Sequence, residues 1–80
     1  MSTTPYQQYL RDLGSLICDK AREAKLLKEK SAGTEDFEFN LGRLMAFHEV
    51  VSLMKQQAEA FGLPLDELSL AELSPERDLL

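Results

Sequence analysis

The sequence predicts an all-α protein built on an antiparallel helical hairpin, and three observations carry this prediction. Two long stretches place apolar residues at helical spacing, and a short break around Gly33 separates them. The 80 residues suffice for a single domain, here taken as 1–80, and the 44% apolar and 29% charged fractions are those of an ordinary globular chain. A connection as short as residues 31–35 makes consecutive helices antiparallel neighbours.

The first helix is expected over residues 5–30. Thr4 as N-cap, Pro5 at the first helical position and Gln7 completing a capping box form a start signal. A set of apolar residues shares one arc of roughly 140° and predicts a buried face: Tyr6, Tyr9, Leu10, Leu13, Leu16, Ile17, Ala21, Ala24 and Leu27. Cys18 projects toward the outer, charged face, and Gly14 marks either the close approach of another helix or nothing.

The second helix is expected over residues 36–61, capped by Thr34 or Asp36 and stopped by Gly62 and Pro64. One apolar row follows heptad spacing: Phe37, Leu44, Phe47, Val51, Met54, Ala58 and Phe61. A second row lies on another side: Phe39, Ala46, Val50, Leu53 and Ala60. Together the apolar positions spread over roughly 240° of the circumference, which is more than one neighbouring helix can cover.

The wide apolar arc predicts self-association. Two hairpins would form a four-helix bundle with the second helices at its centre, and symmetric dimers are the commonest oligomers. The predicted interface is Phe39, Gly42, Ala46, Phe47, Val50, Leu53 and Met54. Asn40 is a candidate for setting register and His48 for pH sensitivity. A different protein partner, or coverage by the C-terminal tail, is the alternative.

The acidic tail, residues 63–80, has one basic residue against five acidic ones, a balance of −4. Its leucines at helical spacing predict one or two helical turns packed over an end of the hairpin. The alternative is a frayed tail from Ser74 onward.

The net charge and the composition narrow the classes of partner that we expect for this protein. The formal charge of −5 disfavours nucleic acid and anionic lipid. No apolar run approaches the ~18 residues of a membrane span. With Cys18 as the single cysteine and no signal-peptide pattern at the N-terminus, we expect a cytoplasmic protein.

Two motifs typical of metal sites are incomplete in this sequence, each at one position. His48 and Glu49 begin an HExxH pattern, but Ser52 stands where the second histidine belongs. Met45 stands where a di-iron site needs glutamate. We therefore expect no catalytic residue, no metal and no cofactor.

The predicted function is that of a small non-enzymatic protein acting through protein–protein contacts, as a regulator, adaptor or inhibitor. The alternative is an RNA- or DNA-binding hairpin that uses residues 20–30, where five basic residues face two acidic ones. Such a dimer resembles the small plasmid-encoded RNA-binding hairpins in architecture only.

Overall fold

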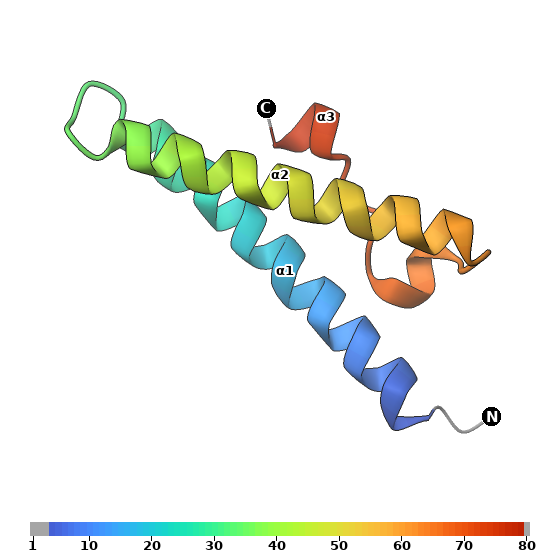
Figure 1. Ribbon diagram of the computed structural model, residues 1–80. Coiled ribbons are helices and arrows are strands. Elements are labelled where there is room, and N and C mark those ends of the chain that lie inside the picture. Colours follow the sequence, from blue (N-terminus) through green and yellow to red (C-terminus); the bar gives the residue numbers. More distant parts are fainter. Residues whose placement is uncertain (1–3, 80) are drawn as a thin grey trace.

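A computed structural model of the chain describes residues 4–79. Two long helices, α1 (Pro5–Lys30) and α2 (Phe37–Ala60), are followed by a short 3-10 helix, η1 (Leu65–Leu68), and a single turn of helix, α3 (Pro75–Asp78). Residues 4–79 contain no strand. The predicted all-α fold with an antiparallel hairpin is therefore confirmed, and the molecule is elongated, with extents of 50 × 21 × 16 Å (Figure 1).

The start of α1 follows the predicted capping box. The Gln7 N–H donates to Thr4 Oγ1 at 3.1 Å, and the Thr4 N–H donates to Gln7 Oε1 at 2.9 Å. These two bonds satisfy backbone donors that no helical carbonyl can reach. Pro5 occupies the first helical position, and α1 ends at Lys30 as expected.

The turn and both ends of α2 are set by local chemistry. Gly33 takes a left-handed backbone, and Thr34 Oγ1 donates to the Ser31 carbonyl at 2.6 Å. Asp36 is the N-cap of α2, but its side chain makes no capping hydrogen bond. The helix begins one residue later and ends one residue earlier than the expected range 36–61.

The C-terminus of α2 closes in a Schellman motif. Gly62 has a φ of 68° and its N–H donates to the Glu59 carbonyl at 3.1 Å. The Leu63 N–H reaches back to the Ala58 carbonyl at 2.8 Å. This pattern needs a left-handed residue, which explains glycine at position 62.

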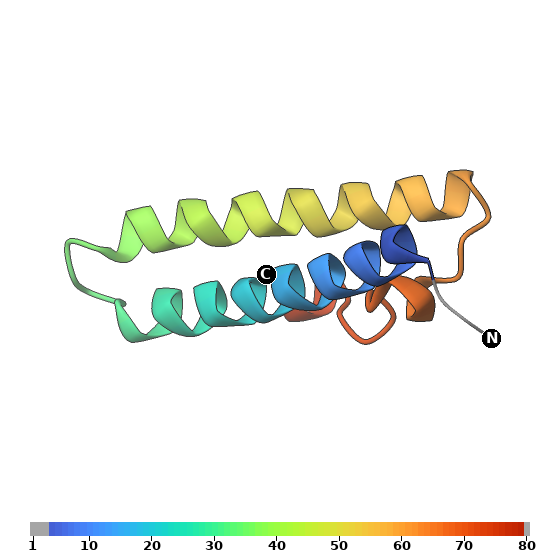
Figure 2. The same ribbon diagram turned by 90° about the horizontal axis from the view of Figure 1, so that it is seen from below.

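The C-terminal segment, residues 63–79, returns along one side of the hairpin (Figures 1 and 2). In Figure 1 it runs from η1, which packs against α1, behind α2 to α3, which contacts α2. Ser69 adopts a left-handed backbone with a φ of 59° where the segment leaves η1. The segment is thus a third packing element and not a frayed tail, so that alternative is wrong for the described residues.

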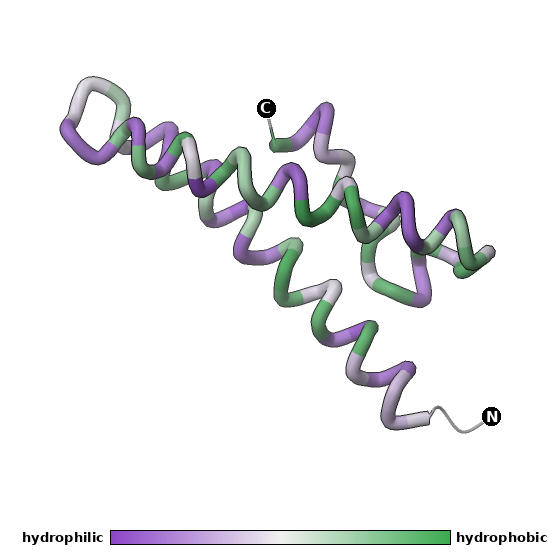
Figure 3. The backbone as a smooth tube through the Cα atoms, viewed as in Figure 1, coloured by the Kyte–Doolittle hydropathy of each residue, from purple (hydrophilic) through white to green (hydrophobic). Residues whose placement is uncertain are grey.

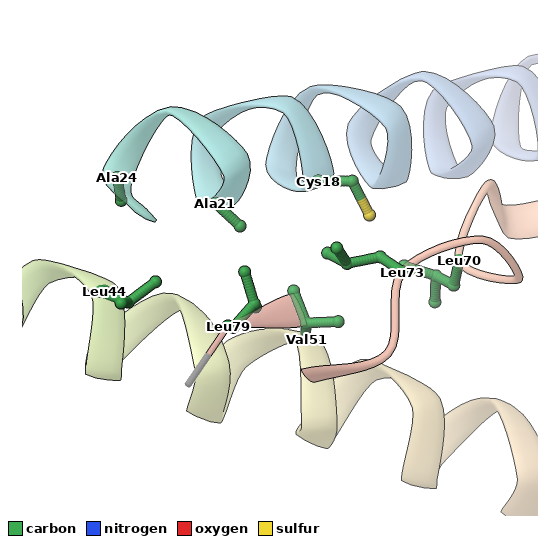
Figure 4. Close-up of a cluster of buried hydrophobic side chains, with 8 residues drawn as sticks. All are labelled: Cys18, Ala21, Ala24, Leu44, Val51, Leu70, Leu73 and Leu79. Atoms are coloured by element: carbon green, nitrogen blue, oxygen red, sulfur yellow. The ribbon is translucent and has the colours of Figure 1, made fainter. Parts of the chain in front are cut away.

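The core combines small residues from α1 with large ones from the C-terminal segment. The side of α1 that is buried consists of Gly14, Cys18, Ala21 and Ala24. Leu70, Leu73, Pro75 and Leu79 of the C-terminal segment are fully buried, together with Leu44 and Val51 of α2. Figure 4 shows Leu70, Leu73 and Leu79 between the two helices. Because small side chains leave room beside α1, the leucines of the segment fill the space.

The predicted buried face of α1 is only partly correct. Ala21 and Ala24 are buried, and Leu13 and Ile17 are half-buried. The larger members of the set remain exposed: Tyr6, Tyr9, Leu10, Leu16 and Leu27. The helix is rotated so that its small residues face the core, since only those allow the C-terminal segment to approach.

Candidate functional site

The outer side of α2 is an exposed apolar surface. Phe39 is 74% exposed and Leu53 is 57% exposed, although both side chains are fully apolar. Val50 and Met45 are exposed beside them, and Figure 3 shows apolar positions on both sides of this helix. We call this surface the α2 outer face and define it by Phe39, Gly42, Met45, Ala46, Val50 and Leu53. Clustered exposed apolar residues of this size mark interaction sites more often than isolated ones do.

The predicted interface residues divide between two sides of α2. Phe39, Gly42, Ala46, Val50 and Leu53 lie on the outer face. Phe47 and Met54 instead pack against the buried core and are half-buried. The hairpin itself therefore uses those two residues, and the outer face keeps the other five.

Gly42 lies in the middle of the α2 outer face and leaves free space above the helix backbone there. Apart from the backbone of its own helix and its two chain neighbours, no described atom lies within 4 Å of the position that a β carbon on Gly42 would take. Ala46 follows one turn later and is also exposed. Two small residues one turn apart allow a second backbone to come close at this point.

Asn40 acts within the hairpin. Its Nδ2 donates to the Leu27 carbonyl at 3.4 Å, and the residue is half-buried. That carbonyl lies in the last turn of α1 and also accepts the Ser31 N–H at 3.0 Å, so the bond from Asn40 is a second, longer one. Asn40 thus fixes α2 against the end of α1 within one chain.

His48 and Ser52 lie one turn apart on α2 and leave two polar atoms unsatisfied. His48 Nε2 and Ser52 Oγ are buried and have no hydrogen-bond partner among residues 4–79. Unsatisfied buried groups cost free energy, and an ordered water is a common remedy. The described residues hold no group of three histidine, cysteine or acidic side chains that could bind a metal ion.

Cys18 is buried, so its predicted place on the outer, charged face is wrong. Its Sγ donates to the Ser69 carbonyl at 3.6 Å, because the C-terminal segment covers this side of α1. Burial raises the pKa of the Cys18 thiol, and the nearby charges of Arg22 and Lys55 oppose this only in part. A thiol with a raised pKa is a poor nucleophile near neutral pH.

A polar recess of about 340 Å³ lies beside Cys18, between α1 and the C-terminal segment. Its lining residues are Ser15, Cys18, Asp19, Arg22, Asp66, Ser69, Ala71 and Glu72. Three carboxylates and one guanidinium give it an acidic balance, and Arg22 already pairs with Asp19 at 3.6 Å. The arrangement pairs no base with the thiol and therefore supplies no means of activating it.

The basic residues of segment 20–30 do not form one surface. Lys20, Arg22 and Lys30 are exposed on different sides of α1, while Lys25 and Lys28 are half-buried. At three-residue spacing, Arg22, Lys25 and Lys28 lie along one side of α1, whereas Lys20 and Lys30 lie on others.

In comparisons with known proteins, no family model, no curated protein and no solved structure matches this sequence. Within residues 4–79, neither long helix carries an apolar stretch sufficient to cross a bilayer.

Sequence reasoning missed the contribution of the C-terminal segment to the surface. Leu63, Leu68 and Leu70 help to line an apolar recess at the end of the hairpin where α1 begins and α2 ends. The helical spacing of leucines in this segment was the available signal. It predicted helical turns, but not which side of the hairpin they would cover.

Proposed function

We propose that this protein is a non-enzymatic interaction protein that works as a homodimer, in which two α2 outer faces pack together in a four-helix bundle. The observation that carries the proposal is the position of this face. It lies opposite the core side of α2, and the C-terminal segment covers a different side (Figure 2). A second copy brings the same apolar face and can bury both at once.

The exposed area of the chain supports this proposal. The chain exposes 5830 Å² of surface. A compact monomer of its 9.0 kDa mass exposes about 4,900 Å². The excess, on the order of 900 Å², is comparable to the roughly 800 Å² that each partner buries in a standard interface. The radius of gyration of 14.2 Å also exceeds the about 11.6 Å of a compact chain of this length.

A regulator, adaptor or inhibitor is the class of function that fits such a dimer. Its remaining surface carries most of the net charge of −5, so basic protein partners are favoured over nucleic acid. A cysteine kept as a free thiol is in keeping with a reducing compartment such as the cytoplasm.

Light scattering coupled to size exclusion tests the dimer. The wild-type protein should give twice the 9.0 kDa chain mass across a concentration series. Leu53→Glu should give a monomer of unchanged helicity, because it buries a charge in the paired faces. Leu26→Glu is the matched control, since Leu26 is 55% exposed on α1, and it should remain dimeric. A monomeric wild type, or a dimeric Leu53→Glu, overturns the proposal.

A further inference from the structure

A second exposed face with large apolar side chains runs along α1. Tyr9 is 65% exposed, Leu16 is 58% exposed and Leu27 is 38% exposed. At about 100° per residue, these three residues share one side of the helix with Lys20 and Glu23, within an arc of roughly 60°. We call this surface the α1 outer face and define it by these five residues.

The α1 outer face lies on the same side of the hairpin as the α2 outer face. The C-terminal segment reaches α1 at Gly14, where the Leu68 carbonyl lies against the helix, and at Cys18, which donates to the Ser69 carbonyl. The α1 outer face is nearly opposite these two residues around the helix. On α2, the segment packs against the core side, which is opposite the α2 outer face. One side of the hairpin is thus covered, and the other side has two exposed faces; in Figure 2, α1 passes in front of part of the C-terminal segment.

The α2 outer face alone is too small for a stable dimer. It has six residues, whereas a standard interface involves roughly 20–30 residues of each partner. Because the two outer faces share the uncovered side of the hairpin, a second copy that packs on one of them can also cover the other. A contact with both helices brings the interface closer to the standard size.

The residues of the α1 outer face favour one way of pairing two copies. Lys20 and Glu23 are exposed, and neither forms an ion pair within residues 4–79. One antiparallel register of two α1 helices places Leu16 opposite Leu27 of the second copy. The same register places Lys20 opposite Glu23 of the second copy, because both pairs are centred between residues 21 and 22. A two-fold axis at this point forms each contact twice.

The same two-fold axis brings the two α2 helices together at small residues. Asn40 donates to the Leu27 carbonyl, so these two positions are nearly level in the hairpin. Counting from that contact at equal rise, the midpoint of α1 is level with residues 45–46 of α2. Ala46 is exposed there, and Gly42 leaves free space one turn before it. The residues of α1 and those of α2 therefore favour the same arrangement of the two copies.

We infer that the second copy packs antiparallel across both helices, with the 31–36 turns at opposite ends, and that the α1 outer face is part of the dimer interface. The inference rests on the dimer proposed above. Leu16 and Leu27 of each copy flank two ion pairs between Lys20 and Glu23, and the C-terminal segments lie on the outside of the bundle. Such charge pairs fix register and orientation more than they add affinity.

Leu16→Glu and Leu26→Glu test whether α1 contributes to the interface. The two leucines are a matched pair, because they are 58% and 55% exposed on different sides of α1. Sedimentation equilibrium measures the dissociation constant of the dimer, and circular dichroism checks that helicity is unchanged. Leu16→Glu should weaken the dimer by about a hundredfold or more, because it places a charge between the paired faces. Leu26→Glu should leave the dissociation constant unchanged.

Lys20→Glu and Glu23→Lys test the antiparallel register. Each single substitution places like charges opposite one another and should weaken the dimer by about tenfold. The double variant restores opposite charges and should dimerise within about twofold of the wild type. A dimer in which α1 packs on α2 of the second copy gives no such recovery.

Three results overturn the inference: a Leu16→Glu dimer as tight as the wild type, single charge substitutions without effect, or a double variant that remains weak. If one of these occurs while Leu53→Glu is monomeric, the dimer proposal stands and this inference alone fails. A monomeric wild type overturns both.

Discussion

The backbone carbonyl oxygen of Leu68 lies against Gly14, in the space that a β carbon on Gly14 would occupy. Gly14 belongs to the middle of α1, and Leu68 ends η1. Glycine in a helix interior costs about 0.5–1 kcal/mol relative to alanine. Here its lack of a side chain lets the C-terminal segment reach the backbone of α1.

Gly14→Ala should therefore destabilise the protein despite its better helix propensity. We expect the free energy of unfolding to fall by about 1–3 kcal/mol, because the carbonyl of Leu68 must move away. Gly42→Ala is the control, with open space at its β-carbon position, and should raise stability by up to about 1 kcal/mol. Urea denaturation of both variants in a Leu53→Glu background removes any contribution from self-association. A Gly14→Ala protein as stable as its parent would show that the contact does not form.

Leu73→Ala should cost about 2–5 kcal/mol, a large share of the stability of so small a domain. Leu73 is 1% exposed and lies between the two long helices (Figure 4). Leu26→Ala removes the same atoms from an exposed position of α1 and should change stability by less than about 0.5 kcal/mol. Equal effects of the two substitutions in urea denaturation would contradict the assignment of the C-terminal segment to the core.

The buried thiol of Cys18 should make stability fall at alkaline pH. Its pKa is raised in the folded protein, chiefly by burial, so the unfolded chain loses this proton first. The stabilisation of the folded protein by the protonated thiol is therefore complete below about pH 8.5, the ordinary cysteine pKa. It declines as the pH rises above that value. Cys18→Ala should remove this part of the pH dependence when denaturation is measured between pH 7 and about pH 10. Parallel pH profiles for the two proteins would refute the prediction.

Asp78 should contribute to stability at neutral pH but not in acid. The Arg77 side chain and the Ser74 N–H, which donates at 2.9 Å, hold the pKa of Asp78 well below its usual range. A lowered pKa means stabilisation that is complete above about pH 4 and is lost as the pH falls further. Asp78→Asn should thus be less stable than the wild type at pH 7, with a difference that shrinks toward pH 2. Thermal unfolding of both proteins between pH 7 and pH 2 measures this difference in stability. A difference that does not change with pH would contradict the prediction.

The helices of this protein follow from local signals, and the sequence predicts them closely. The capping box of Thr4 and Gln7 and the left-handed Gly62 depend on residues within a few positions of one another. Such signals act the same way in any tertiary context, so the ends of both long helices lie within one residue of the expected ranges.

The orientation of α1 and the place of Cys18 could not be predicted in the same way. Periodicity gives most weight to large apolar residues, and it selected Tyr9 and Leu16, which are exposed. The true contact surface consists of Gly14, Cys18, Ala21 and Ala24, whose small size only matters once a third element packs against them. The heptad row of α2 is buried or half-buried in the structure except for Phe61, and the second row is exposed, because each row alone is long enough to define a side of the helix.

Folding order follows from the distance in sequence between α1 and the segment that completes its core. Cys18 and Ser69 are 51 positions apart, and Arg11 and Glu67 are 56 apart. The contact between α1 and α2 closes only a short loop. The contacts between α1 and the C-terminal segment close a loop of more than 50 residues. Loop closure becomes slower and costs more entropy as the loop lengthens. The two helices should thus meet first and transiently expose the furrow of small residues on α1. Before its own C-terminal segment has packed, α1 can accept the leucines of the C-terminal segment of another molecule. At high protein concentration we therefore expect a misfolded, domain-swapped dimer in which two chains have exchanged these segments.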